Sequence, residues 1–227
     1  MKTVRVAQNL GVWMKSGTVW LCGAALCACA SSSPDWQNNA FAAIRSATSA
    51  YLEGNARIAD FEFARAQNEV SRTGRPDRMA RLELVKCAVA VASVDVSPCT
   101  GYDRWSAEAG PEEQAYAAFL AGDWLAIDRD RLPERYRELV ALQPDTVDWV
   151  QLQDPLSKLI AAGVLLKRGR LMIGDADMAI QTASFQGWRR PLLGWLRVRQ
   201  RLAENAQDAE AVVNLQRWIR VVEQGGR

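Results

Sequence analysis

The sequence predicts an all-α protein, and three observations lead to that prediction. Apolar residues recur at three- and four-residue steps along most of the chain, which is the spacing of one face of an α-helix. Proline opens several of these periodic segments, where its fixed backbone angle suits the first helical turn. Glycine-containing breaks separate consecutive segments, so the helices are expected to pair as antiparallel hairpins.

The first three helices are expected on either side of two breaks, Gly54-Asn55 and Gly74-Arg75-Pro76. Their periodic positions are Phe41, Ile44, Thr48, Tyr51 and Leu52, then Ile58, Phe61, Ala66, Glu69 and Val70, then Met79, Leu82, Val85 and Val89. Residues 88–96 are rich in valine and alanine and would also suit a strand. Because they continue the stripe of the third helix, they are predicted to be helical. Further helices are predicted at residues 111–121, 133–142, 155–167, 175–185, 191–204 and 208–224.

The N-terminus reads as an export signal. A positive start at Met14-Lys15 precedes a short run of apolar and small residues, too short to span a bilayer. Either Met1 or Met14 fits as the start of translation. We predict a signal peptide over residues 1–28, a modified cysteine with a flexible tether over 29–36, and a single helical domain over 37–227.

The end of this signal, Leu26-Cys27-Ala28-Cys29, resembles the lipobox of bacterial lipoproteins. The resemblance implies cleavage before Cys29 and attachment of lipid to that cysteine. Ala30 follows where an aspartate would mark retention at the inner membrane, so the resemblance implies the periplasmic face of the outer membrane. The alternative is an ordinary cleaved signal with incidental cysteines.

Composition excludes several classes of function. Three of the 28 basic residues lie in the predicted signal, which leaves 25 basic against 26 acidic residues and argues against a nucleic-acid partner. The chain has no histidine, which excludes Ser-His-Asp and Cys-His hydrolases and the histidine-bearing zinc and haem sites. We therefore expect no metal and no cofactor.

Cys87 and Cys99 are the remaining cysteines after the predicted signal and Cys29. Export to an oxidising compartment favours a disulfide between them, and Ser97-Pro98 provides a turn that brings them together. A redox pair is a weaker interpretation because the spacing is not Cys-x-x-Cys, and a free buried pair is a third.

Part of the helical body resembles tetratricopeptide-like proteins. The spacing of Ala59, Phe63 and Ala66 matches the second helix of such a repeat, in which small residues let the paired helices approach. Tyr51 and Gly54, and later Leu193-Gly194, stand near further repeat positions, but residues 99–154 show no repeat. The resemblance implies a helical repeat array, and a compact helical bundle is the alternative.

Two sets of charged residues are candidate sites. Arg189, Arg190, Arg197 and Arg201 crowd into one helix among tryptophans and suggest a face for anionic lipid, lipopolysaccharide or an acidic partner; a solvated face is the plainer interpretation. The acidic clusters Glu112-Glu113, Asp128/Asp130 and Asp175/Asp177 would serve a carboxylate-dependent peptidoglycan-modifying enzyme. The Glu-Ser dipeptide of goose-type lytic transglycosylases is absent, and cap or loop roles explain these carboxylates equally well.

With no catalytic motif, the expected function is that of a non-enzymatic adaptor or assembly factor that binds an envelope protein. In class it resembles lipoproteins that serve as pilotins or adaptors. The alternatives are the peptidoglycan-modifying enzyme and a module that binds anionic lipid or lipopolysaccharide.

Replacing Cys29 by serine is expected to abolish lipid attachment, because only a cysteine thiol takes the thioether-linked lipid. Metabolic labelling with a fatty acid and fractionation of the membranes measure the effect. Label and membrane retention that persist in Cys29→Ser would contradict the lipobox interpretation.

Overall fold

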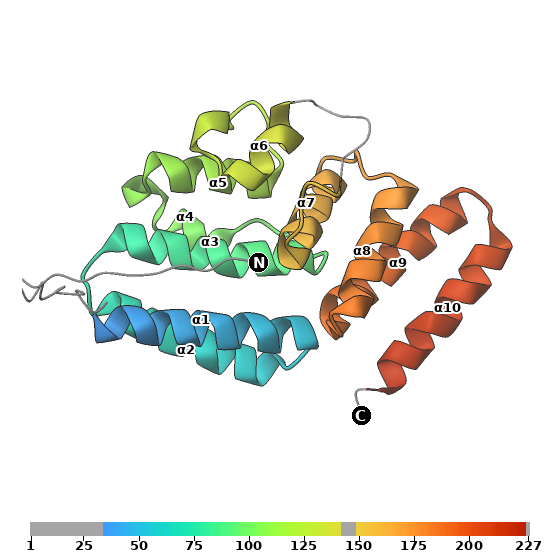
Figure 1. The fold of residues 1–227 in the computed structure, drawn as a ribbon, viewed down its shortest axis with the longest axis horizontal. Helices are drawn as coiled ribbons and strands as arrows, with labels where there is room; N and C mark the ends of the chain where they lie inside the picture. The colour runs from blue at the N-terminus through green and yellow to red at the C-terminus, as the bar shows by residue number, and fades with distance from the viewer. Residues whose placement is uncertain (1–33, 142–148, 226–227) are drawn as a thin grey trace, which may run out of the picture. The chain divides into compact units, whose positions relative to one another are not determined.

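The computed structural model describes residues 34–141 and 149–225 (Figure 1). Its contacts divide the chain into Met1–Ser32, which lies wholly outside the described residues, and Ser33–Arg227, to which everything below belongs. The predicted signal peptide and Cys29 therefore fall outside the described residues.

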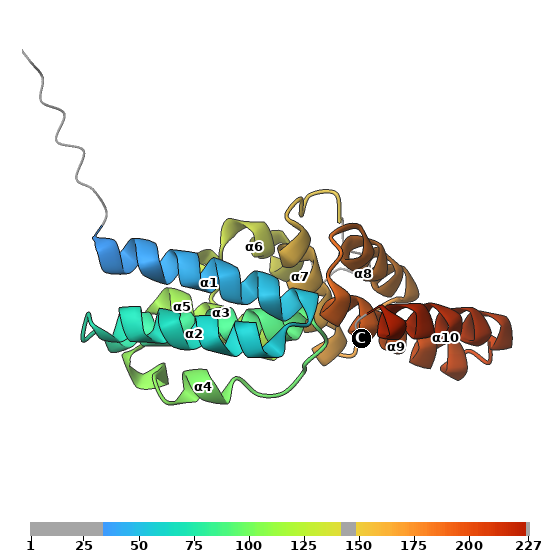
Figure 2. The same cartoon turned by 90° about the horizontal axis from the view of Figure 1, so that it is seen from below.

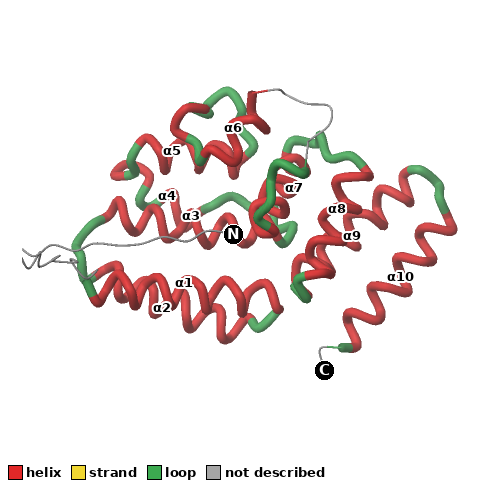
Figure 3. The backbone as a smooth tube through the Cα atoms, in the orientation of Figure 1, coloured by secondary structure: helices red, strands yellow, loops and turns green. Residues whose placement is uncertain are grey.

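Every regular element in these described ranges is a helix, which confirms the all-α prediction (Figure 3). The α-helices are α1 (Asp35–Glu53), α2 (Ala56–Ser71), α3 (Pro76–Ala92), α4 (Thr100–Asp103), α5 (Pro111–Ala121), α6 (Glu134–Ala141), α7 (Pro155–Lys167), α8 (Ile173–Phe185), α9 (Arg189–Asn205) and α10 (Ala209–Gln224). Two short 3₁₀ turns, η1 (Ser106–Glu108) and η2 (Arg129–Arg131), lie between them. The predicted limits of α5 and α7 coincide with those observed, and Leu142 of the predicted 133–142 helix lies outside the described residues.

Helices α1 and α2 form a hairpin that packs through alanine. Gly54, at φ 94°, ends α1 in the left-handed conformation that glycine adopts without strain. Small and apolar residues line the buried faces of the two helices: Ala40, Ala43, Ala47, Ala50 and Leu52 of α1, and Ala59, Phe63, Ala66 and Val70 of α2. The predicted stripes are only partly correct: Leu52, Ala66 and Val70 are buried, whereas Phe41 and Phe61 are 67% exposed.

Helix α3 lies at the centre of the described unit. It contacts α2, α4, α5 and α7, and α6 lies beyond α5 (Figure 1). After α7 the helices follow one another as neighbours, α7 on α8, α8 on α9 and α9 on α10. Figure 2 shows α9 and α10 side by side beyond α8. Helices that are consecutive in the sequence thus pack on one another in α1–α2 and from α7 to α10, whereas α4 and α5 both pack on α3.

Two glycines let α7 and α9 approach the end of α3. A β-carbon on Gly163 of α7 would overlap the carbonyl oxygen of Val91, and one on Gly194 of α9 would lie 2.9 Å from the carbonyl oxygen of Ser93. Trp195 is fully buried beside this contact, and its indole N–H donates to the Ala92 carbonyl at 3.0 Å. The indole therefore satisfies a carbonyl at the end of α3 that has no partner within the helix.

The prediction that this helix continues through residue 96 is wrong, because α3 ends at Ala92. Gly194 abuts the chain at Ser93 and Val94, and Val94 turns away with φ 69°. The backbone of a β-branched residue is strained in this left-handed region by about 1–3 kcal/mol, so the surrounding packing must hold Val94 there. The alternative strand is also not formed.

Gly163→Ala is expected to lower the free energy of unfolding by about 1–3 kcal/mol, because the added methyl group forces α7 away from Val91. Gly174→Ala in α8 is the matched control, since a β-carbon there meets nothing within 4 Å. The control is expected to be neutral or to stabilise by about 0.5–1 kcal/mol. Urea unfolding measures both variants, and an equal effect of the two would contradict the close packing.

Candidate binding cleft

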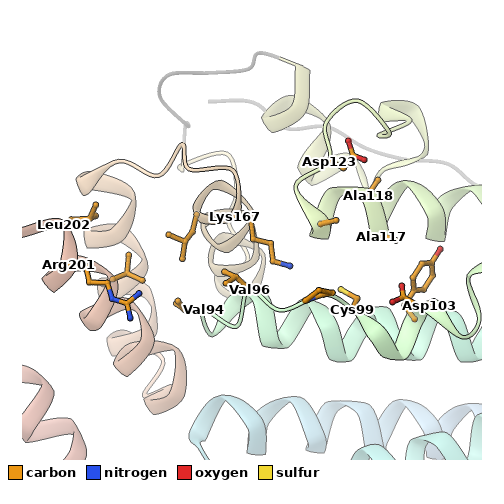
Figure 4. Close-up of a pocket in the computed structure, with 15 residues that line it drawn as sticks. Val94, Val96, Cys99, Asp103, Ala117, Ala118, Asp123, Lys167, Arg201 and Leu202 are labelled. Carbon is orange, nitrogen blue, oxygen red and sulfur yellow. The ribbon is translucent and has the colours of Figure 1, made fainter. Parts of the chain in front are cut away.

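A cleft opens where the end of α3, α4, α5, α7 and α9 meet. Its volume is about 820 Å³, within the range of about 300–1,000 Å³ typical of ligand pockets. Most of its lining is apolar and comes from Val94, Val96, Pro98, Cys99, Ala117, Ala118, Ala121, Leu166, Val198 and Leu202. Figure 4 labels several of them, among them Val96, Ala117 and Leu202, which lie on separate elements. The cleft therefore offers apolar surface to a bound molecule.

One wall of the cleft is the loop between α3 and α4, and several bonds fix it. The predicted disulfide between Cys87 and Cys99 is present, and it ties the end of this loop to α3 with Cα atoms 5.6 Å apart. The Asp95 carboxylate accepts from the Ser97 backbone N–H at 3.0 Å, and the Lys167 ammonium donates to the Ser97 carbonyl at 3.4 Å. A pre-formed wall spares a bound partner the entropy cost of ordering this loop.

The cleft carries opposite charges on its two sides. Lys167 and Arg201 lie on the side of α7 and α9, whereas Asp103 and Asp123 lie on the side of α4 and α5 (Figure 4). Desolvation lowers the pKa of the half-buried Lys167, and the negative charge of Asp95 partly opposes that shift. Within the described ranges Arg201 has neither a hydrogen bond nor an ion pair with another residue. Both cations therefore retain donors for an anionic group.

The predicted basic face is divided by the fold. Arg189 donates to the Val222 and Glu223 carbonyls at the end of α10, and Arg190 donates to the Tyr51 carbonyl at 2.8 Å while it stacks on the Tyr51 ring. Arg197 pairs with Glu223 at 3.0 Å. Three of the four predicted arginines thus join helices to one another, and Arg201 alone of the four lines the cleft.

The three acidic clusters also have contacts within the fold. Arg81 reaches Glu112 and Glu113 at 3.8 and 2.8 Å. Asp128 accepts from the Asp130 N–H and so caps the turn η2. These contacts are of the cap and ion-pair kind, which stabilise helix ends and neighbouring elements.

The two carboxylates that are buried in the described ranges are Glu83 and Asp175. Glu83 pairs with Lys86 at 3.0 Å, and Asp175 accepts from the Met172 N–H and the Trp149 indole at 2.8 and 2.9 Å. Asp177, next to Asp175, pairs with Arg199 at 2.9 Å. Each of these carboxylates thus has a cationic or N–H partner within the fold, and neither Glu83 nor Asp175 lines the cleft.

Sequence reasoning identified Cys99 and Arg201 but missed the other charged residues of the cleft. Lys167 and Asp103 lie at the ends of α7 and α4, 64 residues apart in the sequence, so only the tertiary packing brings them to the same cleft. In the described part of the chain, no cluster of three or more acidic or cysteine side chains is arranged to hold a metal ion. None of its helices is both long and apolar enough to cross a membrane.

Comparison with known protein families, with curated protein sequences and with solved structures finds no match for this chain. The class of protein is therefore defined by the fold and the cleft alone. It is an all-helical protein with a mostly apolar, disulfide-bordered cleft between helices.

Proposed function

We propose that this protein is a lipid-anchored outer-membrane lipoprotein of the periplasmic face, and that its helical body acts as a non-enzymatic adaptor that binds an envelope protein. The observation that carries the adaptor role is the cleft bordered by the Cys87–Cys99 disulfide. The lipobox-like Leu26-Cys27-Ala28-Cys29 supports the anchor and the location.

The lining of the cleft favours a peptide segment as the bound group. Alanine and valine side chains leave a shallow apolar surface that suits the apolar side chains of a partner helix or strand. Lys167 and Arg201 on one side favour a carboxylate of that segment, and Asp103 and Asp123 on the other favour a basic residue. The bound segment is therefore expected to be apolar, with opposite charges toward its two ends.

Chemistry on a polysaccharide would place different demands on the same cleft. A glycoside hydrolase uses two carboxylates, of which the acid has a raised pKa in an apolar pocket. Asp103 and Asp123 are both exposed. No observation in the described residues favours this alternative, so we do not propose it.

A photo-reactive amino acid at Ala121, an exposed residue of the cleft, is expected to crosslink in cells to one dominant envelope protein. The same group at Ala64, an exposed alanine of α2 far along the chain from the cleft residues, is the matched control and should not form that adduct. Mass spectrometry of the purified adducts identifies the partner.

Two variants test the origin of that adduct. Lys167→Met is expected to weaken the adduct, because it removes a cation that would bind a carboxylate of the partner. The free energy of unfolding should change little, because the lost hydrogen bond to the Ser97 carbonyl is offset by the removal of a desolvated ammonium. Cys29→Ser should lose the adduct through mislocalisation. Equal adducts from Ala121 and Ala64, or muropeptides with no protein partner, would contradict the adaptor proposal.

A further inference from the structure

Helix α10 presents a second surface that the cleft does not explain. Its side toward α9 holds the buried Leu215 and the half-buried Val212, Ile219 and Val222. Away from that side Val213 is 50% exposed, Trp218 56% and Val221 69%. Trp218 and Val221 are one turn apart, and such an exposed pair is unusual on a helix that already has a buried side.

Arginines accompany these apolar residues. Val213, Arg217, Trp218, Arg220 and Val221 together form what we call the outer face of α10. A hollow of about 370 Å³ on this face is lined by Arg217, Trp218, Arg220 and Val221 with the neutral Asn214 and Gln224. Arg217 donates only to the neutral Asn214, and none of the described residues forms an ion pair or hydrogen bond with Arg220.

Carboxylates on the same helix form no ion pair with Arg217 or Arg220. Glu223 is engaged by Arg197 across α9 and α10. Glu210 lies seven residues before Arg217, about two turns or 10 Å along the helix. The hollow therefore keeps a net positive charge next to its tryptophan.

We propose that the outer face of α10 lies on a membrane surface that contains anionic phospholipid. Arginine pairs with lipid phosphates, and tryptophan occupies the boundary between headgroups and acyl chains. Two-fold pairing with a second copy fits the face poorly, because it would bring Arg217 and Arg220 of one protomer against the same residues of its partner.

The short tether supports a lipid surface as the occupant. Only five residues separate Cys29 from the start of α1 at Asp35, and the six steps from one Cα atom to the next span about 20 Å of extended chain. This step rests on the lipid anchor proposed above, and such an anchor holds the body close to the headgroups. A surface of arginine, tryptophan and valine on that body then adds a second, non-covalent contact with the bilayer.

Vesicle flotation of the Cys29→Ser protein tests the face without the anchor. The protein is expected to float with vesicles of phosphatidylglycerol and phosphatidylcholine, less with phosphatidylcholine alone, and less as salt is added. Replacing Arg217 and Arg220 by glutamine is expected to weaken partitioning about 30-fold, because each arginine contributes a factor of about five on a charged surface. Adding Trp218→Ser to these two changes should weaken partitioning further, because the indole no longer enters the headgroup boundary.

The matched control replaces Arg45 and Arg57 of the α1–α2 hairpin by glutamine, two exposed arginines with the same change in charge. This control should float as the parent protein does. No flotation on either vesicle, or equal loss in the two double variants, would overturn the proposal. Circular dichroism checks that each variant is folded. A variant that loses flotation is expected to keep the Ala121 crosslink, because the cleft and the outer face of α10 are separate surfaces.

Discussion

The close approach of α7 and α9 to the end of α3 is the packing constraint on which the rest of the structure depends. Gly163 and Gly194 remove the side chains that would keep these helices apart. Trp195 fills the space beside them and donates to the Ala92 carbonyl. Because α9 abuts the chain at Ser93 and Val94, α3 cannot continue, and the following loop must leave sideways. That loop, returned to α3 by the disulfide, becomes a wall of the cleft.

Arginine has two separate uses in this fold. Arg189 and Arg190 donate to carbonyl groups near the ends of α10 and α1, so they join α9 to two other helices. Arg201, Arg217 and Arg220 remain available to other molecules, the first at the cleft and the other two on the outer face of α10. The proposed functions rest on this second group. A net charge near zero conceals the division, because it averages over both uses.

Sequence reasoning predicted the helices far better than their buried faces. The limits of α5 and α7 could be predicted because proline starts each helix and Gly122 or Gly169 follows each end. The buried side of α1 was missed because it is built from alanine, which contrasts little with its neighbours in hydrophobicity. The end of α3 was missed because its cause lies in α9, about a hundred residues later. The cleft was missed for the same reason, although the disulfide at its wall was predicted from two cysteines and the expected compartment.

Native-state hydrogen exchange tests whether the contact of α7 and α9 with the end of α3 is the most stable part of the unit, because it reports the free energy of opening for each amide. We call this contact of α7 and α9 with the end of α3 the junction. If the junction organises the unit, the buried amides of α3, α7 and α9 near Val91, Val164 and Leu196 exchange only through global unfolding. The amides of α10 and of the α1–α2 hairpin then open at lower free energy, since these elements pack on the junction from outside. Opening of the junction amides at a lower free energy than those of α10 would contradict the account.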